Sequence, residues 1–443
     1  MRPQGPRPAA TDDSFSVLIV SDHASAMFGG EAILPLHYFR LLRDRGFRVW
    51  LVTHARTRHE LAKLFPQDER IHYVEDTGLH KLMWRLGRLL PNQLAYATTG
   101  FVARVAVQSA LRKIVRQLVA SERIDIVHQP MPVSPRDPSM IFDVGAPVVI
   151  GPMNGGMDYP PAFRAQRGWL GNLLLRWGRS SAELLNWAVP GKRRAAALLV
   201  ANARTRAALP RGVCQRVEEL VENGVELDLW TASPRRPAAD DTAPVKFAFL
   251  GRLVRLKGVD LLIEAFASAS ARLPMELVII GDGQERERLE RQCARLFPVA
   301  ANARGAPVRF TGWLPQTECA RELDTIDCLV MPSLRDCGGA VVLEAMSMSK
   351  PVIATAWGGP LDYLDASCGI LIEPHDGRSL VHGLAESMVR LAASPAERAA
   401  MGRAGRLKIE RQYDWEVKAA RILHLYLQVL AQASAAAPAA AAR

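Results

Sequence analysis

The sequence predicts an α/β fold with parallel sheets, organised in two domains. Short apolar runs such as 16–21 and 48–53 alternate with amphipathic stretches such as 31–45, a rhythm typical of parallel strands joined by helices. A length of 443 residues favours two domains, with three as the alternative. A hydrophobic content of 49% is sufficient for a sizeable core.

The boundary between the two domains is predicted near residues 215–225. The turn signal Asn223-Gly224 lies there, and the stretch 228–244 that follows is rich in Pro, Ala and Asp, as loops are. The expected parts are a disordered N-terminus at 1–14, an N-terminal domain at 15–222, a C-terminal domain at 223–413, a helix at 414–431 and a disordered tail at 432–443.

The strong positive charge of the chain indicates an anionic partner. The net charge is +11 and the isoelectric point is about 9.6. Nucleic acid, an acidic lipid surface and nucleotide phosphates all satisfy this charge. Because the sequence has no zinc-finger spacing, RNA-recognition signature or basic-zipper heptad, nucleic acid is the weakest of the three and is not expected as a partner.

The cysteines and the apolar runs predict a cytoplasmic protein. The six cysteines show no short pairing pattern, which is typical of reduced thiols in a reducing compartment. The N-terminus lacks the apolar core of a signal peptide. No run reaches the ~18 uninterrupted apolar residues of a membrane-spanning helix.

Two stretches combine an excess of cations with apolar residues. Segment 77–121 holds seven Lys and Arg and no Asp or Glu, and segment 159–217 holds eleven against the single acid Glu183. The first is expected to form helices with an apolar and a basic face, a composition suited to an anionic membrane surface. The alternative is a helical subdomain packed on the core with a solvated basic face.

A short apolar run that reads as a strand precedes residues 333–346, which read as a loop followed by a helix. Gly338 and Gly339 lie between strand and helix, where backbone N–H groups and the helix dipole favour phosphate. Asp336 lies in the loop and Glu344 one turn into the helix, where a carboxylate can accept hydrogen bonds from ribose hydroxyls. The alternative is an ordinary turn with two solvated acids.

A second loop places two cations beside the start of a helix. Arg252 and Lys257 lie between the strand 245–250 and the helix that follows Gly258. Cations at a helix start are poorly placed for the helix dipole, but they can neutralise a bound diphosphate. This Gly-Arg…Lys-Gly arrangement therefore predicts a phosphate clamp.

Further candidates follow strands, because parallel sheets bind ligands beyond the carboxyl ends of their strands. Gly29 and Gly30 follow the first strand, and glycine lets the backbone approach a ligand closely. His128 lies near the carboxyl end of another strand, with a purely structural histidine as the alternative. Asn154 and Gly155 follow a later strand, where donor or acceptor contact competes with a plain turn.

The pattern acid-x7-acid of Asp336 and Glu344, with Gly-Gly between them and Ala-Met after, resembles the donor-binding signature of family 4 retaining glycosyltransferases (glycosyl transferases group 1). The resemblance covers residues 16–431 and is strongest in the second half. It implies the GT-B fold, two facing Rossmann-like domains with a C-terminal helix that crosses back to the first. The family usually has Glu where this chain has Asp336, and many members have His-x-His where it has only His128.

The resemblance also implies residue roles. The implied catalytic residues are His128, Arg252, Lys257 and Asp336, with His128 and Asp336 at the transferred sugar. The implied donor-binding residues are Gly29, Gly30, Arg252, Lys257, Gly281, Gly312, Trp313, Asp336, Gly338, Gly339, Ala340 and Glu344. Asn154 and Gly155 are expected on the acceptor side.

The sequence therefore predicts a retaining glycosyltransferase that moves a sugar from a nucleotide-diphosphate sugar to a hydroxyl. The acceptor is expected to be a lipid-linked saccharide in cell-surface polysaccharide or glycolipid synthesis, met peripherally at the inner face of the membrane. No metal or other cofactor is expected, since the chain has no Asp-x-Asp triplet. The alternatives are a sugar-nucleotide epimerase on the same scaffold, a non-catalytic nucleotide-sugar-binding partner, and a nucleic-acid-binding protein.

Overall fold

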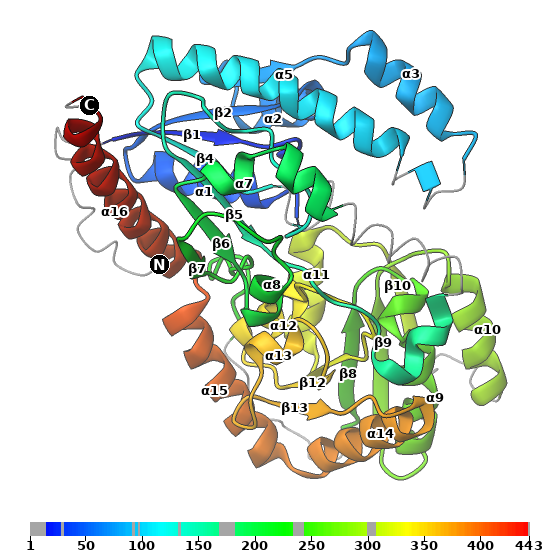
Figure 1. Ribbon diagram of the computed structural model, residues 1–443. Coiled ribbons are helices and arrows are strands. Elements are labelled where there is room, and N and C mark those ends of the chain that lie inside the picture. The colour runs from blue at the N-terminus through cyan, green and yellow to red at the C-terminus, as the bar shows by residue number, and fades with distance from the viewer. Residues whose placement is uncertain are drawn as a thin grey trace. The chain divides into compact units, whose positions relative to one another are not determined.

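The chain divides into two compact units. The computed structural model describes residues 15–27, 31–90, 94–95, 98–131, 134–167, 182–233, 243–298 and 307–441. Unit 1 comprises Met1–Gly156, Arg167–Glu222 and Ala419–Arg443, and unit 2 comprises Met157–Gln166 and Asn223–Lys418. Each unit is an α/β body with its own parallel sheet, as the alternation of apolar runs and amphipathic stretches predicts (Figure 1).

The sheet of unit 1 has seven strands in the order β3-β2-β1-β4-β5-β6-β7, and all its pairs are parallel. The strands are β1 (Ser16–Val20), β2 (Arg48–His54), β3 (Ile71–Val74), β4 (Ile126–Gln129), β5 (Val148–Met153), β6 (Ala197–Val200) and β7 (Val217–Glu219). Parallel pairing places all their carboxyl ends at one edge of the sheet. The residues that follow β1, β2 and β3 are therefore neighbours, although they are far apart in the sequence.

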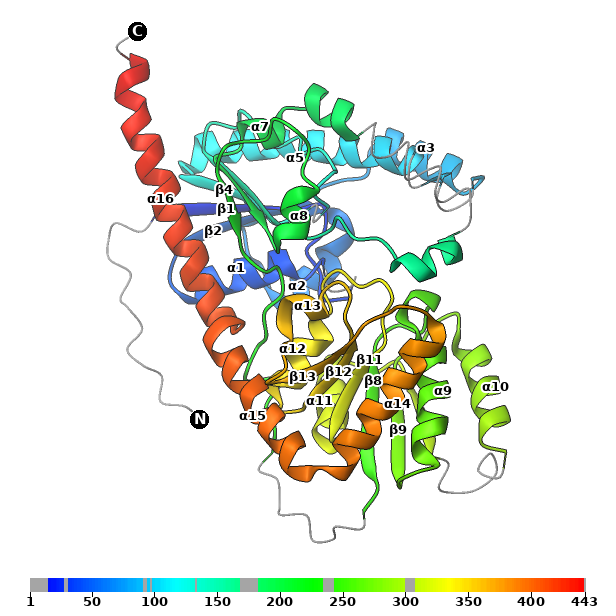
Figure 2. The same ribbon diagram turned by 60° about the horizontal axis from the view of Figure 1, so that its bottom comes forward.

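Helices cover both faces of this sheet. They are α1 (Leu34–Asp44), α2 (Arg58–Leu64), α3 (Gly78–Gly87), α5 (Thr99–Glu122), α7 (Gly191–Arg194), α8 (Ala203–Ala207) and most of α16 (Trp415–Ala441), with the 3₁₀ turn η1 (Ala55–Thr57). The 3₁₀ turn η2 (Pro161–Arg167) belongs to unit 2 except for its last residue. Apolar residues of α5 such as Leu111 and Val115 pack with Leu18 and Val20 of β1. Helix α1 lies on the opposite face, and α3 runs beside α5 (Figures 1 and 2).

The sheet of unit 2 has six strands in the order β10-β9-β8-β11-β12-β13, again all parallel. The strands are β8 (Val245–Leu250), β9 (Met275–Ile280), β10 (Val308–Gly312), β11 (Cys328–Met331), β12 (Val352–Thr355) and β13 (Gly369–Ile372). In chain order within the unit this is 3-2-1-4-5-6, the order of a doubly wound Rossmann sheet. Ligands in such sheets bind where the order reverses, which here is between β8 and β11.

The helices of unit 2 are α9 (Val259–Ser270), α10 (Arg286–Leu296), α11 (Gln316–Thr325), α12 (Ala340–Ser347), α13 (Pro360–Tyr363), α14 (Gly377–Ala393) and α15 (Pro395–Gln412), with the 3₁₀ turn η3 (Arg255–Lys257). Helices α9 and α14 lie side by side (Figure 2). Leu262, Phe266, Leu384 and Met388 from these two helices belong to one buried apolar core with the strands.

The observed division differs from the expected one in two places. Residues 157–166 belong to unit 2, because Phe163 joins its core and the Trp357 indole N–H donates to the carbonyl of Asp158 at 2.8 Å. The expectation of a disordered tail at 432–443 is wrong as far as residue 441, since α16 continues to Ala441. Alanine has the highest helix propensity, so an Ala-rich segment extends a helix that already exists.

The helical expectation for segment 77–121 is confirmed by α3 and α5. Among the described residues, no helix is both long and apolar enough to cross a bilayer.

Candidate active site

The carboxyl edge of the unit 2 sheet gathers most of the residues expected to bind the donor. Four neighbouring strands lead there: β8 to Arg252, β9 to Gly281, β10 to Gly312 and β11 to Asp336. Gly281 and Gly312 are joined by a 2.9 Å hydrogen bond from the Gly281 N–H to the Gly312 carbonyl. Trp313 is 74% exposed beside them.

The β8–α9 loop is held rigidly. Leu253 is fully buried and the N–H of Leu334 donates to the carbonyl of Leu256 at 2.9 Å, which links this loop to the one after β11. Gly258 begins α9 with a φ of +64°, and a Cβ there would lie 2.4 Å from the carbonyl oxygen of Pro332. Only glycine fits this turn, so Lys257 is presented at a fixed point.

Asp336 connects the two loops. Its carboxylate forms an ion pair with Lys257, and both side chains are mostly buried. The second oxygen accepts the N–H of Gly339 at 3.1 Å. The backbone carbonyl of Asp336 accepts the N–H of Gly359 at 2.8 Å. A side chain so placed positions Lys257 and the start of α12, whereas direct contact with sugar hydroxyls stays a prediction.

Helix α12 starts at a strained glycine with no side-chain cap among the described residues. Gly339, its N-cap, has a φ of +62°, and Gly338 precedes it. An uncapped helix N-terminus can donate backbone N–H groups to an anion. Ala340 is the first helical residue, so no side chain bulkier than a methyl stands at this end.

Glu344 lies in the second turn of α12, as the sequence predicts. Burial raises the pKa of its carboxyl to about 7. A desolvated carboxyl gains more from a hydroxyl donor than a solvated one does, because it has given up its hydration. This environment suits a hydrogen bond with a ribose, which stays a prediction for this residue.

The candidate residues of unit 1 lie outside the described residues or are engaged within the unit. Gly29 and Gly30 lie outside the described residues. His128 is fully buried: its Nε2 hydrogen-bonds the carbonyl of Gly151 and its Nδ1 the hydroxyl of Tyr426, both at 2.6 Å. Burial lowers the pKa of His128 to about 4, so the ring is neutral. Both nitrogens are engaged inside unit 1, and contact of His128 with the transferred sugar stays a prediction.

Asn154 is also committed internally. Its amide nitrogen donates to both carboxylate oxygens of Glu222 at 2.6 Å, and both side chains are buried. The N–H of Gly155 donates to the hydroxyl of Thr205 at 3.1 Å. The Asn154 side chain links the segment at the end of β5 to Glu222, and its acceptor role stays a prediction. For Gly155, whose N–H is likewise engaged, acceptor contact stays a prediction.

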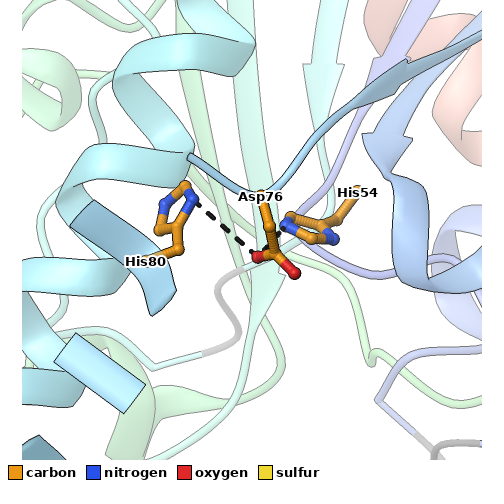
Figure 3. Close-up of side chains that lie close together, drawn as sticks. All are labelled: His54, Asp76 and His80. Carbon is orange, nitrogen blue, oxygen red and sulfur yellow. Dashed lines mark ion pairs between the residues drawn. The ribbon is translucent and has the colours of Figure 1, made fainter. Parts of the chain in front are cut away.

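Sequence reasoning missed a cluster at the carboxyl edge of unit 1. His54 ends β2, Asp76 follows β3, and His80 lies in the first turn of α3 (Figure 3). His54 Nε2 lies 3.3 Å and His80 Nδ1 3.9 Å from the same oxygen of Asp76. The only sequence signal was the pair Asp76-x-x-x-His80, which is too common to single out.

Two imidazoles and a carboxylate can in principle hold a metal ion, and their ligand atoms lie within 4.8 Å of one another. The hydrogen bonds oppose this. His54 Nδ1 accepts the N–H of Arg56 at 3.2 Å, which places the proton on Nε2, and His80 Nδ1 accepts the N–H of Thr77 at 3.0 Å. A metal-binding imidazole has the reverse polarity, with its second nitrogen donating. Arg56 also pairs with Asp76 at 3.2 Å.

Comparison with known proteins finds a family that resembles part of the chain. A profile of the family "Glycosyl transferases group 1" matches residues 244–393, the stretch that carries the cation loop and the Asp336–Glu344 unit. The matched residues all belong to unit 2, so the likeness to this family is carried by that unit. The sequence-based recognition of the family is confirmed.

Two curated relatives and one solved structure illustrate the likeness. A GDP-mannose-dependent monoacylated alpha-(1-6)-phosphatidylinositol monomannoside mannosyltransferase of Corynebacterium glutamicum is 32% identical over 47% of this chain and 55% of its own length. A 2-deoxystreptamine glucosyltransferase of Streptomyces kanamyceticus is 30% identical over 55% of this chain and 62% of its own. The chain thus spans little more than half the length of these relatives.

The structural likeness covers both units. The crystal structure of Anabaena Alr3699/HepE in complex with UDP matches 94% of this chain and 100% of its own with a TM-score of 0.64 at 16% identity. That identity speaks for the fold alone, and it confirms the predicted GT-B class.

Proposed function

We propose that this protein is a retaining glycosyltransferase that transfers a sugar from a nucleotide-diphosphate sugar to an acceptor hydroxyl. The observation that carries the proposal is the convergence of Arg252, Lys257 and the uncapped start of α12 at one sheet edge, inside the segment that matches the family. Cations and helix amides together favour a diphosphate. The carboxylate of Glu344 accepts hydrogen bonds from the ribose hydroxyls.

In the proposed reaction the bond between the anomeric carbon and the diphosphate oxygen breaks. The oxygen of the acceptor hydroxyl bonds to the anomeric carbon on the same face of the sugar. The proton of this hydroxyl passes to the departing diphosphate. Arg252, Lys257 and the backbone N–H groups in the first turn of α12 stabilise the negative charge that develops on the leaving group. Asp336 serves by holding Lys257. Neither a metal ion nor a carboxylate nucleophile is part of the proposal.

Three measurements test this reaction. A thermal-shift panel of UDP-, GDP- and ADP-sugars should reveal one stabilising nucleotide, because a ligand at ~100 times its Kd adds about 2.7 kcal/mol of stability. Product NMR should show a retained anomeric configuration, and excess EDTA should leave the rate unchanged. Inversion, a metal requirement, or donor epimerisation with no acceptor present would each contradict the proposal.

For the acceptor we propose a lipid-linked saccharide presented at an anionic membrane surface. Helix α3 exposes Leu82 and Trp84, and Leu89 just beyond it is 81% exposed. Lys81 and Arg85 belong to the same helix. Exposed apolar groups beside cations are suited to the lipid interface. One relative described above is named for a phosphatidylinositol monomannoside, whereas the other is named for 2-deoxystreptamine. The relatives therefore do not decide between a lipid-linked and a soluble acceptor.

Liposome flotation tests the membrane proposal. The double variant Leu82→Ser/Leu89→Ser should float with phosphatidylglycerol vesicles much less than wild type. The control Leu407→Ser, which changes an exposed leucine of α15, should float normally. Absence of wild-type flotation at low salt would reject a membrane-bound acceptor and leave the transferase proposal intact.

A further inference from the structure

Unit 1 contains a pocket of about 470 Å³ at the carboxyl edge of its sheet. Its floor is formed by Asp22 and His23 after β1 and by His54 at the end of β2. Its walls come from α3 and α5, which contribute Trp84 and Val107 among other residues. In parallel sheets this edge is where ligands bind. The pocket lies wholly within unit 1 and is distinct from the cation loop of unit 2.

One buried polar atom of this pocket, Nε2 of His80, has no hydrogen-bond partner among the described residues. His80 is 3% exposed and lines the pocket, and no described residue offers its Nε2 a hydrogen bond. Because the Nδ1 of His80 accepts the N–H of Thr77, its proton lies on Nε2, which is therefore a donor. Buried donors without a partner are costly in native structures, so such an atom marks a place where a ligand oxygen belongs.

The charges of the lining favour an anion. Among the described lining residues, three guanidinium groups, those of Arg56, Arg88 and Arg104, face a single carboxyl, that of Asp22. Asp76, which is not part of the lining, pairs with Arg56 at 3.2 Å. Burial raises the pKa of Asp22 to about 7, so near neutral pH much of this carboxyl is uncharged and can donate a hydrogen bond.

The imidazoles add donors without adding charge. Burial and the Arg56 guanidinium lower the pKa of both His23 and His54. The polarity of the hydrogen bonds at His54 and His80, described above, opposes a metal cation here. Neutral N–H donors beside guanidinium groups form the environment that proteins use for phosphate oxygens.

We propose that this pocket binds a phosphate group of the sugar acceptor, so that the enzyme selects phosphate-bearing acceptors over neutral ones. The inference rests on the proposed function, because it assigns the pocket of unit 1 to the second substrate of the same transfer. Arg88 and Arg104 neutralise the phosphate, His80 donates to it, and Trp84 and Val107 cover the apolar part of the acceptor.

The binding test uses Lys257→Met protein, in which the diphosphate site of unit 2 is disabled. Binding of inorganic phosphate, D-glucose 6-phosphate and D-glucose is measured by calorimetry. The two phosphates should bind and glucose should not. Adding His80→Gln or Arg104→Gln should weaken phosphate binding about tenfold, the effect of one charge-assisted hydrogen bond. Arg85→Gln removes the same charge from α3 outside the pocket and should change binding less than twofold.

A vesicle arm distinguishes a soluble phosphate from a lipid headgroup. If the phosphate belongs to a lipid, phosphatidylinositol vesicles should bind wild type better than the His80→Gln variant. Phosphatidylglycerol vesicles should contact only the basic surface of the protein and should bind both proteins equally. Failure of both the soluble phosphates and the vesicle discrimination overturns the proposal, and so does equal binding by glucose and glucose 6-phosphate. The nucleotide-sugar panel with intact Lys257 reports on the transferase proposal separately.

Discussion

The donor edge of unit 2 and the pocket of unit 1 occupy equivalent places on two parallel sheets, yet they are built differently. At the donor edge a cation and a carboxylate are already paired: Lys257 forms an ion pair with Asp336, which also accepts the N–H of Gly339. In the pocket, His80 Nε2 and one oxygen of Asp22 lack hydrogen bonds from any described residue. A preorganised edge suits the diphosphate proposed for it, whereas buried polar atoms without hydrogen bonds from described residues suit the recognition of one particular acceptor.

The largest expected effect tests the donor edge. Lys257→Met should lower kcat/KM by about 10²–10³, the loss measured when one charge-stabilising donor is removed from an active site. Its carboxylate partner Asp336 would lose its ion pair as well. Arg255→Met, a cation of the same loop whose side chain is exposed, should retain activity within about threefold. Equal losses in both variants would mean that the loop supplies only diffuse charge.

Glu344 should show opposite effects on stability and on activity. An acid with a raised folded pKa stabilises the fold below its unfolded pKa of 4.5 and loses this contribution as pH rises through about 7. Between pH 4.5 and 7 the wild type should lose up to about 3 kcal/mol relative to Glu344→Gln, measured by urea unfolding. Asp22 titrates in the same window, so Asp22→Asn is the control for its share.

The same Glu344→Gln substitution should reduce kcat/KM by about tenfold to a hundredfold, because an amide is a weaker acceptor for two ribose hydroxyls. A variant that gains stability above pH 7 while it loses activity identifies a residue kept for function. A loss of both would assign Glu344 to the fold instead.

Sequence predicted the donor edge because its residues are local. Arg252 and Lys257 lie within one loop, and Asp336 and Glu344 within one strand–helix unit, so residue types and spacing carry the geometry. The parallel sheets were predictable for the same reason, since each strand is a short apolar run. The prediction of a disordered tail was wrong because an Ala-rich segment has a high helix propensity and extends α16.

The hydrogen-bond partners of His128 and Asn154 could not be predicted, because they are remote in the sequence. The hydroxyl that occupies His128 comes from Tyr426, 298 residues later, and the carboxylate that holds Asn154 comes from Glu222. Nothing near His128 in the sequence distinguishes a histidine that faces a ligand from one that is fully buried. The pocket could not be predicted for the same reason, since its residues come from the ends of two strands and from two helices.

Tyr426→Phe tests the structural assignment of His128. The variant leaves Nδ1 of a buried imidazole without its partner and should cost about 1–3 kcal/mol of stability, measured by urea unfolding. Because the folded pKa of His128 is lowered to about 4, its contribution to stability is present above pH 6.5 and is lost as pH falls toward 4. Activity per folded molecule should stay within twofold; a hundredfold loss at unchanged stability would support the sugar-contact role.

The smallest expected effect separates the two uses of His80. Its imidazole occupies the N3 position of a capping box, in which Thr77 accepts the His80 N–H and His80 Nδ1 accepts the Thr77 N–H. Glutamine serves this position equally well, so His80→Gln should change stability by less than about 0.5 kcal/mol, whereas His80→Ala should cost about 1 kcal/mol. If His80→Gln keeps the stability of wild type and still loses phosphate binding, the pocket and not the cap explains the histidine. If both variants are equally destabilised, the Nε2 side of the ring contributes to folding, and its lack of a partner would no longer point to a ligand.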